Sequence, residues 1–417
     1  LSFYAEDKMS LLLGANKPEL QLGVRTISLP SLDSKYYLSG RTYLDPRINA
    51  VWNFPSFNVG NIPMKLLVAG GYGLTTKMPT VDYLYPQLHY NDIIQLNYYD
   101  VNRPNELSRV SVRTYIEDAT NYSLRPARNH KWEIRLGAEW GRNTLSVTYF
   151  REKMNDGFRY TTVYAPYEYR KYDASAIDPG TLTEAPDLSR LPYSDRRILD
   201  GMRHVTNGSR IDKQGVEFQL TTARLKCIGT SLTISGAWLH TLYSNSQMLY
   251  SPVTDVVGSQ PVSELYVGIY NTRDGRVNDQ INTNFMFDTQ IPRWGLVFST
   301  SIQCMWHVKS TRLKENGVPD SYISASDGLI HPYTEASRQD LMLQYLIKEY
   351  NDASFDTMTI PTAMYINLKA TKKIGRWLKL SAFVNRLIDY LPDYKNNGVT
   401  IRRYADAYFG MEATLTL

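Results

Sequence analysis

Residues 132–140 read Trp-Glu-Ile-Arg-Leu-Gly-Ala-Glu-Trp, and this stretch decides the fold class. Apolar residues stand at every second position from Trp132 through Leu136 to Trp140, with Glu133, Arg135, Gly137 and Glu139 between them. A period of two puts successive side chains on opposite faces of a β-strand. One face of this strand is therefore apolar and the other is polar.

The same alternation recurs along the chain, at residues 144–149, 216–221, 365–370, 378–385 and 408–417. Several alternating segments run long, among them Ser231–Leu242, Trp294–His307 and Trp377–Ile388. Soluble strands usually have about five or six residues, whereas strands that span a membrane need about 9–11. The polar faces carry Glu, Arg, Lys, Gln and Asn, as the lining of a watery lumen would require. The pattern predicts an all-β fold, a transmembrane antiparallel β-barrel.

The spacing predicts about thirteen strands whose connections are alternately short and long. The expected strands are 1–13, 20–29, 43–54, 63–75, 130–140, 144–155, 212–223, 230–243, 280–290, 294–308, 363–374, 377–389 and 408–417. The long connections are 30–42, 76–129, 156–211, 244–279, 309–362 and 390–407. All long loops then emerge on one side, as in an outer-membrane barrel with short periplasmic turns. Segments 93–99 and 110–115 could form a further hairpin, in the wall or above it, and 265–270 is similarly open.

Composition excludes several classes of protein. The chain has 417 residues, a formal net charge of only +5, 2 Cys, 6 His and 32 Tyr. A nucleic-acid partner is not expected at so mild a charge. Two cysteines rule out a disulfide scaffold, and Cys227, Cys304 and six scattered histidines give no zinc cluster. The sequence shows no run of about 18 apolar residues and no catalytic constellation, so we expect neither a transmembrane helix, an enzyme nor a resident cofactor.

Asn121-Tyr122-Ser123-Leu124-Arg125-Pro126 is followed by Glu133 and Gly137 on the next predicted strand. This segment resembles the Asn-Pro-x-Leu-Lys-Pro box in the C-terminal barrel of TonB-dependent outer-membrane receptors. Tyr122 departs from the usual Pro, and Leu417 from the usual final Phe. Further matching segments are 3–8, 22–25, 45–49, 71–73, 78–80, 84–86, 214–217, 383–387 and 409–410.

This resemblance implies a barrel of 22 strands around a plug. Residues 1–417 would then be the C-terminal portion of the barrel, with the plug domain and nine N-terminal strands upstream, because an odd number of strands does not close such a barrel. The implied function is energy-coupled import of a scarce nutrient (siderophore, glycan, peptide or similar) across the outer membrane. The implied partners are the TonB complex of the inner membrane through the missing N-terminal region, outer-membrane lipid and, as a further candidate, a surface lipoprotein.

Loop 156–211 is the most suggestive stretch for contact with cargo. Tyrosine offers rigid contact area together with a hydroxyl, which suits sugars, peptides and chelates. The alternative role for these tyrosines is an interfacial aromatic girdle or packing within the loop. The candidate cargo-binding residues are Arg159, Tyr160, Tyr164, Tyr167, Tyr169, Arg170, Tyr172 and Tyr193.

Three alternatives to active import stay open. A passive porin or channel would have an open lumen without a plug. A haem receptor could use His89, which lies in the loop where some similar receptors place a haem ligand. A soluble secreted adhesin or glycan-binding module would account for the β-strands without a membrane.

Overall fold

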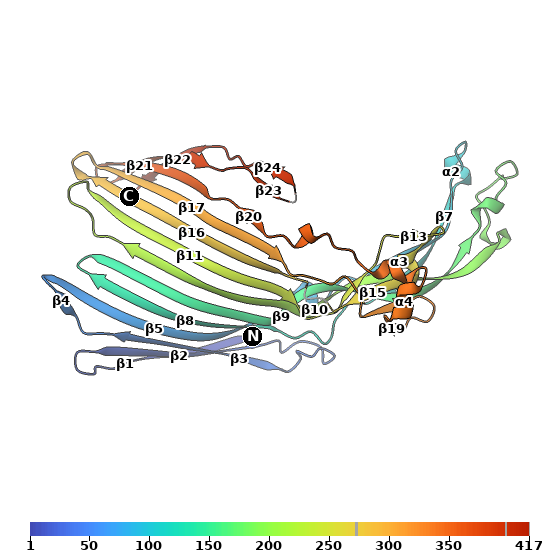
Figure 1. Cartoon of the computed structure of the whole chain (residues 1–417), viewed down its shortest axis with the longest axis horizontal. Coiled ribbons are helices and arrows are strands. Elements are labelled where there is room, and N and C mark those ends of the chain that lie inside the picture. The colour runs from blue at the N-terminus through green and yellow to red at the C-terminus, as the bar shows by residue number, and fades with distance from the viewer. Residues whose placement is uncertain (272–273, 397, 417) are drawn as a thin grey trace.

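The chain is almost entirely β-structure in the computed structural model, which describes residues 1–271, 274–396 and 398–416. A broad curved sheet forms one end of the molecule, and long hairpins project from it at the other end (Figure 1). The predicted all-β antiparallel fold is confirmed. No helix in the described part of the chain has the length and apolarity needed to cross a membrane.

Thirteen strands form the wall of this sheet, each hydrogen-bonded to the next wall strand along the chain. They are β1 (Ser2–Ser10), β2 (Lys17–Ser28), β3 (Thr42–Asn53), β5 (Ile62–Lys77), β8 (Ala127–Trp140), β9 (Asn143–Tyr172), β10 (Tyr193–Thr221), β11 (Thr230–Asn245), β16 (Arg276–Ile291), β17 (Leu296–Arg312), β21 (Ala363–Ile374), β22 (Leu378–Tyr390) and β25 (Tyr408–Leu415). Short β4 (Phe57–Val59) and β20 (Met358–Ile360) add to its margins, on β5 and β17. Every pairing is antiparallel, and the thirteen predicted wall strands are confirmed.

The connections alternate as predicted. Brief turns join the wall strands at one end, and the long connections leave from the other (Figure 1). Within the described residues, β1 pairs only with β2, and β25 only with β22, so the sheet has two open edges. Leu417, which was expected to continue the last strand, lies outside the described residues.

The register sorts the wall side chains into an apolar face and a polar face. On β8, Trp132, Ile134, Leu136 and Trp140 share one face, and the pairing with β5 places Tyr72 and Val68 beside them. Ile134 and Leu136 are 50% and 56% exposed, so this apolar face is uncovered. Lys131, Glu133, Arg135 and Glu139 occupy the opposite face, because neighbours in sequence alternate across the sheet.

Aromatic residues bound the apolar face at two levels. The upper row crosses the wall through Tyr72, Trp132, Tyr149 and Trp238. Trp306 on β17 continues it, with its indole N–H donating to the Thr283 hydroxyl on β16. The rings of Trp132 and Tyr149 are 5.4 Å apart. The lower row contains Trp52 and Trp140, near the short turns. Eight residues separate Trp132 from Trp140, which is about 27 Å along a strand.

The loop predicted at 156–211 is mostly strand, which corrects that boundary. β9 continues to Tyr172 and β10 begins at Tyr193, and the two remain paired from Thr144↔Thr221 out to Tyr172↔Tyr193. The segment is rich in Thr, Val and Tyr, which favour strands. Beyond the rest of the wall, β9 and β10 continue to hydrogen-bond to each other along the edge that they share. We call this projecting part, residues 156–209, the arm.

Several smaller elements lie near the arm, and others lie along the wall (Figure 1). The open question about segments 93–99 and 110–115 is settled: they belong to a separate two-stranded sheet outside the wall. That sheet comprises β6 (His89–Tyr98) and β7 (Arg109–Glu117). A four-stranded sheet holds β12 (Leu249–Ser251), β15 (Tyr266–Tyr270), β18 (Ser321–Ser324) and β19 (Ile330–Pro332). The remaining elements are α1 (Val81–Leu84), α2 (Pro104–Leu107), α3 (Val262–Leu265), α4 (Glu335–Gln339), β13 (Val256–Val257), β14 (Gln260–Pro261), β23 (Tyr394–Asn396), β24 (Val399–Ile401) and 3₁₀ turns at 174–176, 188–190, 292–294, 343–346 and 352–355.

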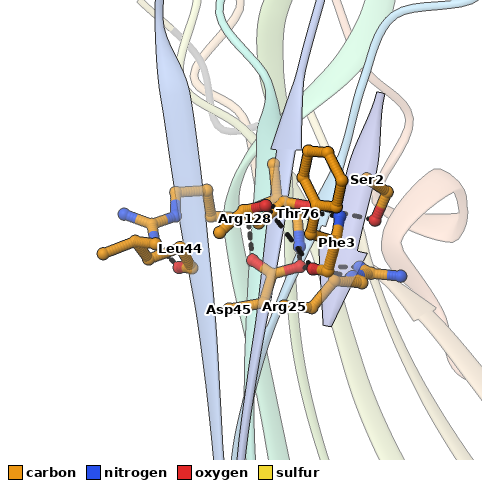
Figure 2. A network of polar contacts seen from close by, with 8 residues as sticks. Ser2, Phe3, Arg25, Leu44, Asp45, Thr76 and Arg128 are labelled. Atoms are coloured by element: carbon orange, nitrogen blue, oxygen red, sulfur yellow. Dashed lines mark hydrogen bonds and ion pairs between the residues drawn. The ribbon is translucent and has the colours of Figure 1, made fainter. Parts of the chain in front are cut away.

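A polar network ties three wall strands together on the loop side of the sheet (Figure 2). The Asp45 carboxylate accepts hydrogen bonds from the Arg25 guanidinium at 2.6 Å and from the Thr76 hydroxyl at 2.5 Å. Thr76 also donates its backbone N–H to Asp45, at 3.0 Å. The side chain of Asp45 is 4% exposed. These hydrogen bonds therefore offset the free-energy cost of burying its charge.

Candidate functional site

The two-stranded sheet of β6 and β7 packs against the arm through tyrosines. The rings of Tyr115 on β7 and Tyr167 on β9 lie 4.9 Å apart, and the Tyr115 hydroxyl donates to the backbone carbonyl of Glu168. Ile93 and Leu96 of β6 are buried, 6% and 1% exposed. Aromatic contact and apolar burial therefore fix this sheet beside the arm.

A hollow of about 830 Å³ opens where the two units meet near the end of the arm. We call it the arginine groove. Its lining comes from β6, β7, β9 and β10, which long loops separate in the sequence. The residues are Gln95, Arg113, Tyr115, Glu168, Tyr169, Arg170, Tyr172, Asp195, Arg196 and Arg197.

The arginine groove is cationic. Four arginines against two carboxylates leave a net charge of +2. Arg197 is ion-paired with Glu168, and the Arg170 Nε lies 3.7 Å from the Asp195 carboxylate. No carboxylate among the residues that the structure describes is ion-paired with Arg113 or Arg196. These two guanidiniums are available to an anionic ligand, and their planar forks suit carboxylate and phosphate oxygens.

Aromatic rings give the groove flat contact surfaces. The Arg113 guanidinium carbon lies 5.3 Å from the centre of the Tyr115 ring, and that of Arg170 lies 4.6 Å from the centre of the Tyr193 ring. Tyr172 and Tyr193 meet edge to face at 5.7 Å. Such contacts hold the arginine side chains in place without neutralising them.

Tyrosine hydroxyls in and under the groove stay protonated. Burial raises the pKa of Tyr167, and its neighbour Glu117 raises it further. Burial likewise raises the pKa of Tyr169, with a contribution from Glu264. At neutral pH both are neutral phenols that can donate hydrogen bonds.

The structure divides the predicted cargo-binding residues into two groups. Tyr169, Arg170 and Tyr172 line the arginine groove, and Tyr193 packs against Tyr172 at its margin. The other four lie closer to the wall or inside packed regions; they are Arg159, Tyr160, Tyr164 and Tyr167.

Each member of the second group has a protein partner. Arg159 lies 3.3 Å from the Asp274 carboxylate, and the Tyr160 ring contacts the Tyr83 ring at 5.9 Å. Tyr164 stacks on Tyr250 in the apolar cluster under the four-stranded sheet. Tyr167 is 5% exposed.

Seven lining residues were missed in the sequence: Gln95, Arg113, Tyr115, Glu168, Asp195, Arg196 and Arg197. The adjacent Arg196-Arg197 pair was a visible signal inside a segment already singled out for its tyrosines. Arg113 and Tyr115 carried no such signal, since the packing of β7 on the arm brings them to the groove.

His89 begins β6, where it pairs with Glu117 across the hairpin, and it is half-buried. No group of three or more His, Cys, Asp or Glu side chains that could hold a metal ion occurs among the described residues. Cys227 is exposed and Cys304 is buried, and both are free thiols.

Comparisons with known proteins find structural similarity only. No protein-family model matches the sequence, and no curated protein matches it. Solved structures that match include the ferric-catecholate import receptor Fiu from E. coli K12 in a closed form, with a TM-score of 0.40 and 10% sequence identity. The match covers 92% of this chain and 49% of the receptor, so the chain spans about half the length of that protein.

Proposed function

We propose that residues 1–417 form the C-terminal part of the barrel of an outer-membrane receptor that imports a scarce nutrient. The observation that carries this proposal is the two-sided wall. Its apolar face is uncovered between two aromatic rows about 27 Å apart along a strand, and its other face is polar. With the usual strand tilt of about 40°, this distance corresponds to a band about 20 Å tall, close to the apolar band of about 25 Å in outer-membrane barrels, which also have aromatic borders and a polar interior.

In this proposal the nine remaining strands and the plug lie upstream of residue 1, and the TonB complex supplies energy by acting on that upstream region. The polar face of the wall lines the lumen, and the projecting hairpins make the first contact with cargo. A surface lipoprotein remains a candidate partner. The unpaired edges of β1 and β25 support a larger barrel, because a spanning sheet edge without a partner costs several kcal/mol for each exposed backbone group.

The arginine groove suits an anionic cargo with flat groups. Arg113 and Arg196 would bind its carboxylate, phosphate or other anionic oxygens. Tyr169 and Tyr172 would contact its rings and donate hydrogen bonds. An anionic siderophore, an acidic glycan or an acidic peptide would each fit this chemistry.

Uptake by cells that carry the full-length protein tests the proposal. Labelled anionic siderophores, acidic oligosaccharides and acidic peptides are offered with and without a protonophore. We expect one class to accumulate only in energised cells. Arg113→Gln with Arg196→Gln should weaken its binding at least about tenfold, because each charge-assisted hydrogen bond contributes about 1.5–3 kcal/mol. Lys171→Gln with Arg190→Gln removes the same charge outside the groove and serves as the control.

The alternatives predict different results. A passive channel would take up cargo equally with and without the protonophore. It would also give steady conductance when the full-length protein is placed in a planar bilayer. Growth on haem that is lost in His89→Ala would point to haem as cargo. A protein that stays in solution without detergent would eliminate the membrane proposal.

A further inference from the structure

A second hollow, of about 660 Å³, lies on the wall itself and not on the arm. We call it the wall pocket. It forms where β9, β10 and β11 leave the wall and meet the segment after β17. Its lining is Lys153, Asn155, Arg210, Ile211, Asp212, Leu242, Ser244, Asn271, Leu313, Lys314, Glu315 and Asn316.

The register places the wall pocket on the apolar, outward side of the sheet. Leu242 pairs with Asp212, and Asp212 pairs with Lys153, so these three side chains share a face. Leu242 has the same parity on β11 as Trp238 of the upper aromatic row, and Lys153 has the same parity on β9 as Tyr149. The pocket therefore faces away from the lumen.

The same register fixes its height. Lys153 lies four residues beyond Tyr149, and Leu242 lies four residues beyond Trp238, which is about 13 Å along each strand. With the usual tilt of such strands, of about 40°, the rise is about 10 Å. Lipid headgroups form a layer roughly 5–8 Å thick above the hydrocarbon. Long Lys and Arg side chains at the height of the pocket can extend down into this layer.

Three cations in the wall pocket are left without acidic partners. Asp212 is held by Arg151 at 2.7 Å, and Glu315 by Arg312 at 2.9 Å. In the part of the chain that the structure describes, Lys153, Arg210 and Lys314 form no ion pair, and all three are exposed. Leu242 and Leu313 add apolar surface to the same hollow.

The outward positions at this height on β2, β3 and β5 are uncharged; they hold Thr26, Leu44 and Leu74. Arg128 on β8 is the cation beside them. It is half-buried and donates a hydrogen bond to the Leu44 carbonyl, unlike the three exposed cations of the wall pocket.

We propose that the wall pocket binds the phosphate of an outer-leaflet lipid, with Lys153, Arg210 and Lys314 contacting the phosphate oxygens. Leu242 and Leu313 contact the apolar part of the same molecule. The inference rests on the membrane location in the proposed function, and goes beyond cargo import. Its apolar lining and its height favour a lipid over a free phosphate ion. Three cations that surround one anionic headgroup give the selectivity typical of basic lipid sites.

The test uses full-length protein purified from membranes, stripped of lipid in mild detergent and titrated in native mass spectrometry. The probes are diphosphorylated lipid A, the same lipid without phosphates, and inorganic phosphate. We expect the phosphorylated lipid to bind and the dephosphorylated lipid to bind much more weakly. Lys153→Gln with Arg210→Gln and Lys314→Gln should weaken binding about a hundredfold. Lys153→Gln alone should weaken lipid binding about fivefold. This single variant keeps the test valid if the triple variant fails to fold.

The matched control removes three cations from the polar face, as Lys131→Gln, Arg135→Gln and Lys213→Gln, and should bind the lipid like the natural protein. Equal binding by the pocket variants and the natural protein overturns the inference. So does equal binding of the two lipids. If inorganic phosphate displaces the lipid at concentrations similar to that of the lipid, the pocket is a site for small anions and not a lipid site. Fractionation of the cells separates this result from the proposed function, since a protein absent from the outer membrane defeats that function first.

Discussion

Arg25 on β2 and Asp45 on β3 form an ion pair with an N–O distance of 2.6 Å, and the Asp45 side chain in this pair is 4% exposed. Asp45 also accepts two hydrogen bonds from Thr76 on β5, so one carboxylate joins three consecutive wall strands (Figure 2). The backbone pairs between β3 and β5 end at Arg47↔Gly73, short of Asp45 and Thr76. The side chains of Asp45 and Thr76 therefore continue the contact between these two strands beyond their last backbone pair.

Replacing Asp45 by Ala should therefore destabilise the wall. The substitution leaves the Thr76 N–H and hydroxyl without their acceptor, which costs about 1–3 kcal/mol for each buried unsatisfied group. The thermal midpoint of the purified full-length protein in detergent would report this loss. Glu139→Ala, at an exposed position of the polar face, is the control and should leave the midpoint nearly unchanged. Equal midpoints for the two variants would show that the network contributes nothing.

The uncovered face of β8 should tolerate no charge if it faces lipid. Leu136 lies midway between Trp132 and Trp140. Leu136→Arg should cost about 2–4 kcal/mol, the penalty for a cation at the bilayer midplane. Unfolding of the full-length protein from lipid vesicles in denaturant measures it. Ser235→Arg places the same residue on the polar face of β11 and should cost less than about 1 kcal/mol. A wall that accepts both substitutions equally would not be embedded in lipid.

The native thiols report which end of the wall faces the cell exterior. Cys227 is exposed in the turn between β10 and β11, and Cys304 is buried. A membrane-impermeant maleimide should label Cys227 only after the outer membrane is permeabilised, since this turn lies at the periplasmic end in the proposed orientation. Ser189→Cys in a Cys227→Ser background should be labelled on intact cells. Labelling of Cys227 on intact cells would reverse the orientation.

Tyr115 should hold the β6–β7 sheet against the arm. Tyr115→Ala removes the ring contact with Tyr167 and the hydrogen bond to the Glu168 carbonyl. The aromatic pair alone contributes about 0.5–1.5 kcal/mol beyond its buried area. Hydrogen exchange at residues 109–117 should therefore accelerate about tenfold or more. Tyr90→Ala, at a 60% exposed ring on the same sheet, should change exchange little. Unchanged exchange in Tyr115→Ala would show that other contacts fix the sheet.

The arm should lose stability in acid through His204. Burial lowers the pKa of His204 below its usual value of 6.5, so the unfolded chain binds a proton more readily than the folded arm. Above pH 6.5 both states are neutral and the effect vanishes. As the pH falls below 6.5 the folded state is penalised, until the pH passes the lowered pKa. Thermal midpoints between pH 7.5 and pH 5 should fall less steeply for His204→Gln than for the natural protein. Parallel slopes would contradict this prediction.

The strands of the wall could be predicted from the sequence, because the alternation of apolar and polar residues that defines each strand lies within one short stretch of chain. Alternation such as that of residues 132–140 defines two faces, and a buried or lipid-facing strand cannot shift by one residue without inverting them. Turn and loop lengths then placed the thirteen strands in order. The length of the arm was not predictable in this way, since alternation beyond residue 155 is the same in a wall strand and in a free hairpin.

Only the tertiary structure decided the two hollows. Arg113 on β7 reaches the arginine groove because Tyr115 packs on Tyr167, more than fifty residues further along the chain. The wall pocket likewise needs Lys153 of β9, Arg210 of β10 and Lys314 of the segment after β17, which lie far apart in the sequence. Local patterns fix which side of a strand a residue occupies, whereas convergence of distant side chains depends on packing between elements, which no single stretch of sequence encodes.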